Sequence, residues 1–166
     1  MKIDIQLVPE GDKPVLCQML ELYLHDFSEY DHADLNEHGY YGYRYLDTYW
    51  IEPGRYPFLI KADGKLAGFV LVNKHSYRTP DEDLHSIAEF FVLRKYRRLG
   101  IGKQVAVMIF ERFPGKWEVN QHPDNLFSIQ FWEDVISSYT NGNYELDQVT
   151  TEDWTGPSLT FNNAKT

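Results

Sequence analysis

The stretch Leu84–Lys103 constrains this chain more than any other part of its sequence. It begins as a strand, and the apolar end Phe90–Leu93 is typical of a strand that is buried on both faces. Its last ten positions hold five basic residues and no acidic one, although the formal net charge of the chain is −9. Gly100 and Gly102 allow a tight backbone turn, and an apolar stripe that begins at Ile101 predicts a helix. This order predicts an anion site at the helix start, where unpaired N–H groups face a phosphate.

Two common phosphate-binding signatures do not match this turn. A Walker loop needs Gly-x-x-x-x-Gly-Lys-Ser/Thr, and the residues around Lys103 lack both that spacing and the hydroxyl residue after the lysine. A dinucleotide-binding fold needs Gly-x-Gly-x-x-Gly near the first strand, with an acidic residue further on. The structural alternative is an ordinary strand-to-helix turn with a solvated basic face.

The rest of the sequence alternates between strand and helix patterns. With 166 residues the chain has the size of one domain, and we expect a single domain over residues 1–166. The pair Asp63-Gly64 predicts a hairpin between two strands. We expect strands near 2–8, 58–61, 66–72, 84–93, 117–119, 144–149 and 158–161, helices near 13–30, 101–113 and 125–138, and short helices and loops over 31–56. Such an order indicates an α/β or α+β fold.

Composition excludes several classes of protein. Cys17 is the only cysteine, which rules out an internal disulfide and a multi-cysteine metal site, and the histidines lack a helical metal-binding spacing. We therefore expect no metal. No stretch is apolar over the length of a membrane span, so we expect a cytoplasmic protein that does not bind a membrane. The excess of acidic residues argues against a nucleic-acid partner and favours neutral or cationic ones.

The residues of the basic turn match a known family. The segment Arg97-Arg98-Leu99-Gly100-Ile101-Gly102 resembles the coenzyme A loop of the GNAT superfamily, Arg/Gln-x-x-Gly-x-Gly/Ala, and the preceding Glu89-Phe90-Phe91-Val92 resembles the fourth strand of that family. The elements expected over 56–162 also follow the order of the family. The resemblance implies a central mixed, largely antiparallel twisted sheet of about six to seven strands, flanked by about four helices. It implies an N-acetyltransferase that moves an acetyl group from acetyl-CoA to a primary amine of a small molecule or peptide, by direct attack on the thioester.

The same resemblance assigns the residues that would hold acetyl-CoA. It implies that backbone groups of the fourth strand bind the pantetheine arm and that N–H groups of the turn bind the pyrophosphate. The expected set is Phe91, Val92, Arg97, Arg98, Leu99, Gly100, Ile101, Gly102, Lys103 and Asn125. Asn125 is equally well placed to be the N-cap of its helix.

The comparison with relatives also gives the catalytic candidates. Glu89 is the candidate base, because relatives carry an acid at this place on the strand, and its setting should raise its pKa. The structural alternative is a carboxylate paired with a lysine or an arginine. Trp132 occupies the place where many relatives have a tyrosine that protonates the leaving thiolate, and an indole N–H is too weak an acid for that step. Tyr139, a tyrosine from 40–49 or water could take over this step.

The sequence does not identify the acceptor of the acetyl group. Aromatic and acidic residues are interleaved over 31–50, which corresponds to the acceptor wall of relatives, and they would suit a cationic amine unless they simply pack the interior. Two other functions compete with the enzyme: a non-catalytic acyl-CoA-binding module, and an interaction protein that uses the aromatic segment as a dimer interface. A homodimer is also compatible with the enzyme.

Overall fold

The computed structural model describes residues 1–81 and 83–165. Seven strands form one sheet in the order β1-β2-β3-β4-β5-β7-β6. Only β4 and β5 run parallel among the neighbouring pairs. The strands are β1 (Ile3–Leu7), β2 (Tyr56–Ala62), β3 (Lys65–Asn73), β4 (Leu84–Val92), β5 (Lys116–Asn120), β6 (Glu145–Thr150) and β7 (Thr155–Asn162). This mixed, largely antiparallel sheet confirms the predicted fold class, and the β2–β3 hairpin lies where Asp63-Gly64 predicted it.

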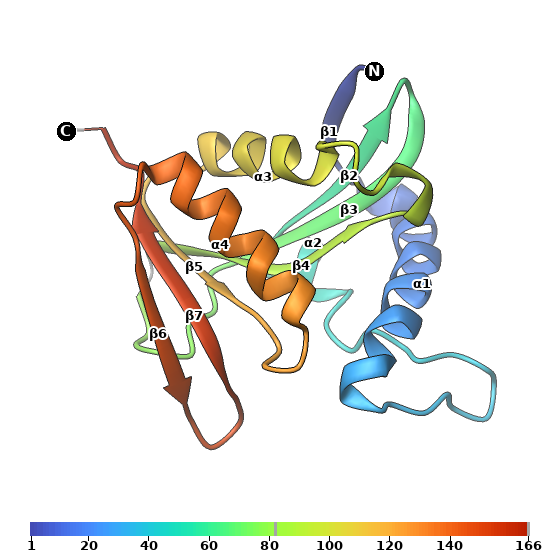
Figure 1. The fold of residues 1–166 in the computed structure, drawn as a ribbon. Coiled ribbons are helices and arrows are strands. Elements are labelled where there is room, and N and C mark those ends of the chain that lie inside the picture. Colours follow the sequence, from blue (N-terminus) through green and yellow to red (C-terminus); the bar gives the residue numbers. More distant parts are fainter. Residues whose placement is uncertain (82, 166) are drawn as a thin grey trace.

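Helices cover both faces of the sheet (Figure 1). They are α1 (Lys13–Asp31), α2 (Thr48–Ile51), α3 (Ile101–Arg112) and α4 (Leu126–Thr140), with short 3-10 turns at Glu10–Asp12 and Arg94–Tyr96. The three long helices confirm the expected ones. Between the end of α1 at Asp31 and the start of β2 at Tyr56, the structure has the four-residue helix α2 and is otherwise loop and turn. None of the helices in the described part of the chain has the length and apolar character needed to cross a membrane.

Two hydrophobic clusters lie on opposite faces of the sheet. The larger one joins the sheet to α3 and α4 through fully buried side chains such as Ile109, Trp117 and Ile136. The smaller one joins β3 and β4 to α1 and to the segment around α2, through Leu16, Tyr49 and Phe69. Strand β4 therefore contributes to both clusters, as its central position in the sheet requires.

The sheet opens between β4 and β5. Their pairing is confined to three residues, Leu84–Ser86 with Lys116–Glu118, after which the strands diverge (Figure 1). The second half of β4 therefore keeps β3 on one edge and has no strand on the other. Phe90 and Val92 are partly exposed for this reason, whereas the apolar run had predicted burial on both faces. An apolar run reports that side chains avoid water, but it does not show where a neighbouring strand ends.

Candidate active site

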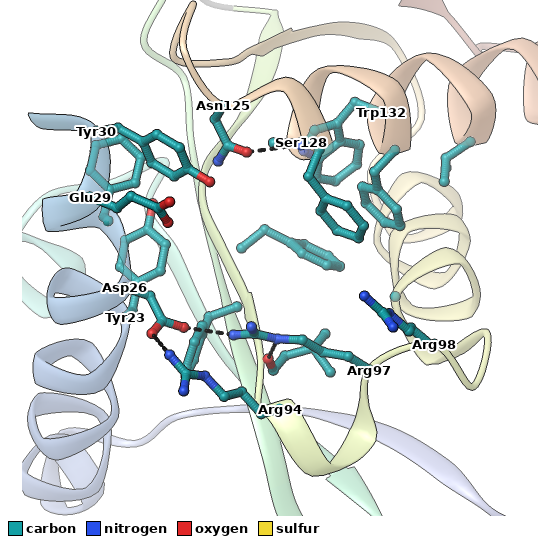
Figure 2. Close-up of a pocket in the computed structure, with 18 of the residues that line it drawn as sticks. Tyr23, Asp26, Glu29, Tyr30, Arg94, Arg97, Arg98, Asn125, Ser128 and Trp132 are labelled. Carbon is teal, nitrogen blue, oxygen red and sulfur yellow. Dashed lines mark hydrogen bonds and ion pairs between the residues drawn. The ribbon is translucent and has the colours of Figure 1, made fainter.

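A pocket of about 800 Å³ lies over the open edge of β4. Figure 2 shows α1 on one side of it, α4 on the other and the turn after β4 between them. Tyr23, Asp26 and Tyr30 line it from α1, at a helical spacing that places them on one face. Phe90, Phe91 and Val92 line it from β4. The remaining lining includes Arg94, Arg97, Arg98, Gly100, Gly102, Lys103, Asn125, Ser128 and Trp132.

The turn between β4 and α3 has the backbone of an anion site. Arg98 and Gly100 both have left-handed backbones, with φ of 62° and 78°. For Arg98 this conformation costs roughly 1 kcal/mol, and such strain is typical of ligand sites. The first N–H groups of α3 have no partner within the helix and face the same concavity. The Leu99 side chain is exposed and that of Ile101 is buried in the core, and neither of these two predicted donor-site residues is among those that line the pocket.

An acidic residue of α1 holds two of the arginines in place. The Asp26 carboxylate accepts hydrogen bonds from Arg94 at 2.7 Å and from Arg97 at 2.8 Å (Figure 2). Burial alone would raise the pKa of Asp26, but the two guanidinium groups outweigh that effect and lower it. Arg98 and Lys103 are not part of this bridge. The bridge joins α1 to the turn. The positive charges of Arg98 and Lys103, which also line the pocket, are left without this partner.

The open edge of β4 presents the backbone of Val92. The N–H of Leu93 donates to Ala67 of β3 at 2.8 Å, and successive strand residues face opposite edges. The Val92 carbonyl therefore faces away from β3, where it accepts a 2.7 Å hydrogen bond from Arg97 Nε. Phe91 faces β3 with its main chain, and it contributes to the pocket with its ring.

Both predicted roles of Asn125 are compatible with its position. Its side-chain oxygen accepts a 3.0 Å hydrogen bond from Ser128 N, so it is the N-cap of α4, and it also lines the pocket. Trp132 lies about two helical turns after Asn125. It is buried edge-on against Phe90, with ring centroids 5.0 Å apart. Trp132 therefore shapes the pocket wall rather than offering an acid.

Glu89 lies on the opposite face of β4 from Phe90. The hydroxyl of Tyr23 donates to one carboxylate oxygen, and the hydroxyl of Tyr43 donates to the other at 3.3 Å. Protein atoms surround Glu89 on most sides, although its side chain keeps part of its surface open. Burial raises the pKa of Glu89 to about 7, against the lowering effect of the two hydroxyls. Among the described residues no lysine or arginine forms an ion pair with Glu89, so the alternative of a simple salt bridge is not what the structure shows.

Further tyrosines surround this carboxylate. Burial, followed by the charge of Glu89, raises the pKa of Tyr49 to about 12 and also raises that of Tyr77. Tyr77 belongs to the loop after β3 and stacks on Trp154 of the β6–β7 turn, with ring centroids 4.6 Å apart. The buried Glu118 carboxylate holds this loop, because it accepts a 3.0 Å hydrogen bond from the Tyr77 N–H. Three separate segments thus place aromatic hydroxyls around one carboxylate.

The structure does not bring Tyr139 to the pocket. Its hydroxyl donates to Glu111 at 2.7 Å and accepts a hydrogen bond from Asn163 at 3.1 Å, and it is not among the residues that line the cavity. Tyr139 lies one turn or more beyond Val135, the last pocket residue of α4. Within residues 1–81 and 83–165, no three His, Cys, Asp or Glu side chains gather as metal ligands would.

Sequence reasoning missed three residues of this site, namely Tyr23, Asp26 and Tyr77. The first two belong to α1, where Tyr23 fits the apolar stripe of the helix. The signal was present in the spacing of Tyr23, Asp26 and Tyr30, which places two hydroxyls and a carboxylate on the same helical face as that stripe. Tyr77 carries no local signal, because its neighbours in space come from β5 and from the β6–β7 turn.

A mixed sheet that opens over a pocket, with an anion-binding turn between strand and helix at one end, defines the class of coenzyme A-dependent acyltransferases. The chain belongs to the acetyltransferase (GNAT) family, whose model matches residues 16–135. This membership supports acetyl transfer from a coenzyme A donor and an acyltransferase enzyme. It confirms the family that the basic turn indicated.

Solved structures show the same fold. An acetyltransferase from Thermus thermophilus superposes with a TM-score of 0.71 at 16% identity, over 98% of this chain and 97% of that one. The aminoglycoside acetyltransferase AAC(6')-Ib in complex with coenzyme A and kanamycin gives 0.67 at 16% identity, over 97% and 95%. The ribosomal-protein-S18-alanine N-acetyltransferase from Escherichia coli gives 0.60 at 13% identity, over 99% and 96%. Among curated protein sequences no match to this chain is found.

Proposed function

We propose that this protein transfers the acetyl group of acetyl-CoA to a primary amine, with Glu89 as the base. One observation carries the proposal: strand β4 connects an anion-binding turn at its end with a carboxylate in its middle that is buried among hydroxyls. The turn suits the pyrophosphate of the donor, and Glu89 suits the acceptor. Solved relatives in complex with coenzyme A support the donor, since they share the fold of this chain.

The donor would occupy the pocket between α1 and α4. N–H groups from Arg98 to Lys103 would bind its pyrophosphate, and Asn125 would contact it from the start of α4. The Val92 backbone lies on the open strand edge, where it would bind the pantetheine arm. The Val92 carbonyl is already held by Arg97, so this contact requires the arginine to share or release that oxygen.

The transfer requires a neutral amine next to a polarised thioester. Glu89 would accept a proton as the amine attacks, and its raised pKa suits a base that works near neutral pH. A backbone N–H on the open edge of β4 would polarise the thioester carbonyl. Because the amine attacks directly, no acyl group is carried on the protein.

The acceptor proposed here is a cationic small-molecule or peptidyl amine. Tyr43 contacts Glu89 through its hydroxyl, and Tyr77, which the charge of Glu89 affects, stacks on Trp154. Aromatic faces in this region would attract a cation. Asp47 of the aromatic segment is engaged by Lys13, so the attraction comes from the rings and from Glu89 rather than from all the acids of that segment. One solved relative is an aminoglycoside acetyltransferase in complex with kanamycin, and another is a ribosomal-protein-S18-alanine N-acetyltransferase, which supports an amine acceptor.

Isothermal titration with acetyl-CoA tests the donor site. We compare the wild type with a variant in which Gly100 and Gly102 are both changed to valine. Valine at Gly100 is strained by the left-handed φ, and a Cβ at Gly102 would lie 3.1 Å from the Phe131 ring. We expect micromolar binding to the wild type and none to the variant.

Gly142→Val is the matched control for that experiment. Gly142 also has a left-handed φ, of 82°, but open space surrounds it and it does not line the pocket. This variant should keep the wild-type affinity. If the wild type fails to bind acetyl-CoA, or if the control loses binding as fully as the double variant, the proposed donor site is wrong.

A further inference from the structure

The proposed transfer leaves one proton without a route. As the thioester carbon–sulfur bond breaks, the leaving thiolate needs a proton, and the amine releases one to Glu89. Trp132 is not an acid, and the Tyr139 hydroxyl is bound to Glu111 and Asn163 outside the pocket. The proton donor for the thiolate must therefore be another group, one that lines the donor pocket and can receive a proton back from Glu89.

Tyr23 connects Glu89 to the donor pocket. It lines the donor pocket from α1 (Figure 2), and its hydroxyl donates to the Glu89 carboxylate. Its ring packs against Phe91 of β4 with centroids 5.8 Å apart, and against Phe69 at 5.6 Å. These two contacts fix the position of the ring in a residue that lines the pocket and whose hydroxyl contacts Glu89.

We propose that Tyr23 is the acid of this reaction: its hydroxyl protonates the leaving thiolate and is itself reprotonated by Glu89. This inference rests on the proposed function. Its geometric basis is that Tyr23 combines a place in the pocket wall with a hydrogen bond to the base.

The steps balance without any further reactant. The amine nitrogen forms a bond to the acetyl carbon and gives a proton to a Glu89 oxygen. The carbon–sulfur bond breaks, and its electron pair goes to sulfur, which takes the proton of the Tyr23 hydroxyl. Glu89 then passes its proton to the Tyr23 oxygen. The products are the amide and the free thiol, and both side chains return to their starting protonation states.

Neighbouring tyrosines meet only one of the two requirements. Tyr43 donates to Glu89 at 3.3 Å but is not among the pocket-lining residues. Tyr30 lines the pocket, but it packs against Phe27 and His122, with centroids 5.9 Å and 6.0 Å away. Burial, followed by the charge of Glu89, raises the pKa of Tyr23 well above its ordinary value, which disfavours a free tyrosinate. The donation to sulfur is therefore coupled to the return of a proton from Glu89, which has lost its charge by taking the proton of the amine.

The test compares Tyr23→Phe with Tyr43→Phe in the full-length protein. Each change removes one hydroxyl that lowers the pKa of Glu89, so both should move the ascending limb of the pH–rate profile to higher pH. Above that limb Glu89 is ionised in both variants. We expect kcat of Tyr23→Phe on this plateau to remain about 30-fold or more below that of Tyr43→Phe, the scale of a lost general acid. The acetyl-CoA Kd should differ by less than about twofold between the two variants.

A conservative variant separates chemistry from packing. A single 3-fluorotyrosine at position 23 keeps the ring and the hydroxyl, and it should restore at least about a third of the wild-type plateau rate. Equal plateau rates in Tyr23→Phe and Tyr43→Phe would overturn the inference and leave acetyl transfer by Glu89 intact. A wild type that binds no acetyl-CoA would instead remove the proposed function, and this inference with it.

Discussion

At the scale of single residues, Glu89 is the group whose chemistry its surroundings change most. It is a carboxylate on a central strand, with hydroxyls from Tyr23 and Tyr43 as partners and no cation bound to it within the described residues. Burial without a counter-charge favours the neutral acid. A carboxyl group that titrates near neutral pH can change protonation during each reaction cycle, which suits a base.

The first prediction concerns the pH dependence set by Glu89. The rate should rise with pH through about 7, because the base must be ionised. Glu89→Gln should lower kcat at neutral pH by ~10² or more and abolish this limb. An unchanged rate would remove Glu89 from the mechanism.

The pH dependence of stability gives an independent check on Glu89. The pKa of Glu89 in the native state, about 7, lies above the ordinary 4.5, so the native state binds more protons than the unfolded state between these two pH values. The free energy of unfolding should therefore fall from pH 4.5 to 7 in the wild type and not in the variant.

At the scale of elements, the contact between β3 and β4 fixes the position of β4, the strand that contains Glu89 and Val92. Gly68 of β3 lies opposite Val92, and any side chain there would place its Cβ 2.0 Å from the Phe91 carbonyl oxygen. Such a contact is far inside van der Waals distance, and the obstacle is backbone rather than a flexible side-chain end. A glycine is therefore required for β4 to approach β3 this closely.

The second prediction follows from this contact. Gly68→Ala should lower the free energy of unfolding by roughly 1–3 kcal/mol, because the strands must separate locally to admit a methyl group. It should also weaken acetyl-CoA binding, since Val92 belongs to the donor site. Urea unfolding with titration of the folded variant measures both effects. Gly11→Ala is the control, because nothing lies within 4 Å of a Cβ there. Equal stability of the two variants would show that β4 tolerates the displacement.

At the scale of the whole molecule, charge is distributed unevenly. The formal net charge is −9, whereas the turn after β4 carries a cluster of basic residues. Asp26 compensates Arg94 and Arg97, and Arg98 and Lys103 remain at the pocket wall. On the proposed function, the negative surface would attract a cationic amine from a distance, and the local positive turn would bind the anionic donor. The two proposed substrates would therefore meet opposite fields, one at the end of β4 and one near its middle.

The third prediction concerns ionic strength. With acetyl-CoA saturating, kcat/KM for a polyamine should fall several-fold between about 20 and 300 mM salt, because screening removes the long-range attraction. An anionic amino acid should be a poor acceptor, and its kcat/KM should rise or stay level over the same range. Steady-state rates with the two amines at several salt concentrations provide the measurement. A preference for the anionic amino acid would contradict the cationic acceptor.

The sequence by itself determined the main elements, the fold class and the place of the basic glycine turn between β4 and α3. These features depend on local rules: hydrophobic periodicity for the helices and strands, and Gly100 with a basic run for the turn. It also singled out Glu89 and Asn125, whose places on β4 and at the start of α4 are set by position along the chain. Trp132 was recognised in the same way as a residue unable to supply the acid.

Only the tertiary structure decided which side chains meet. The sequence could not show that β5 leaves β4 after Ser86, because the end of a strand pairing depends on packing between distant segments. For the same reason it offered Tyr139 as a catalytic candidate and gave Tyr23 no role. The structure binds Tyr139 to Glu111 and Asn163, and it brings Tyr23 to Glu89 across 66 positions of sequence. Contacts of that separation have no local pattern, since they arise only when α1 packs on the open sheet.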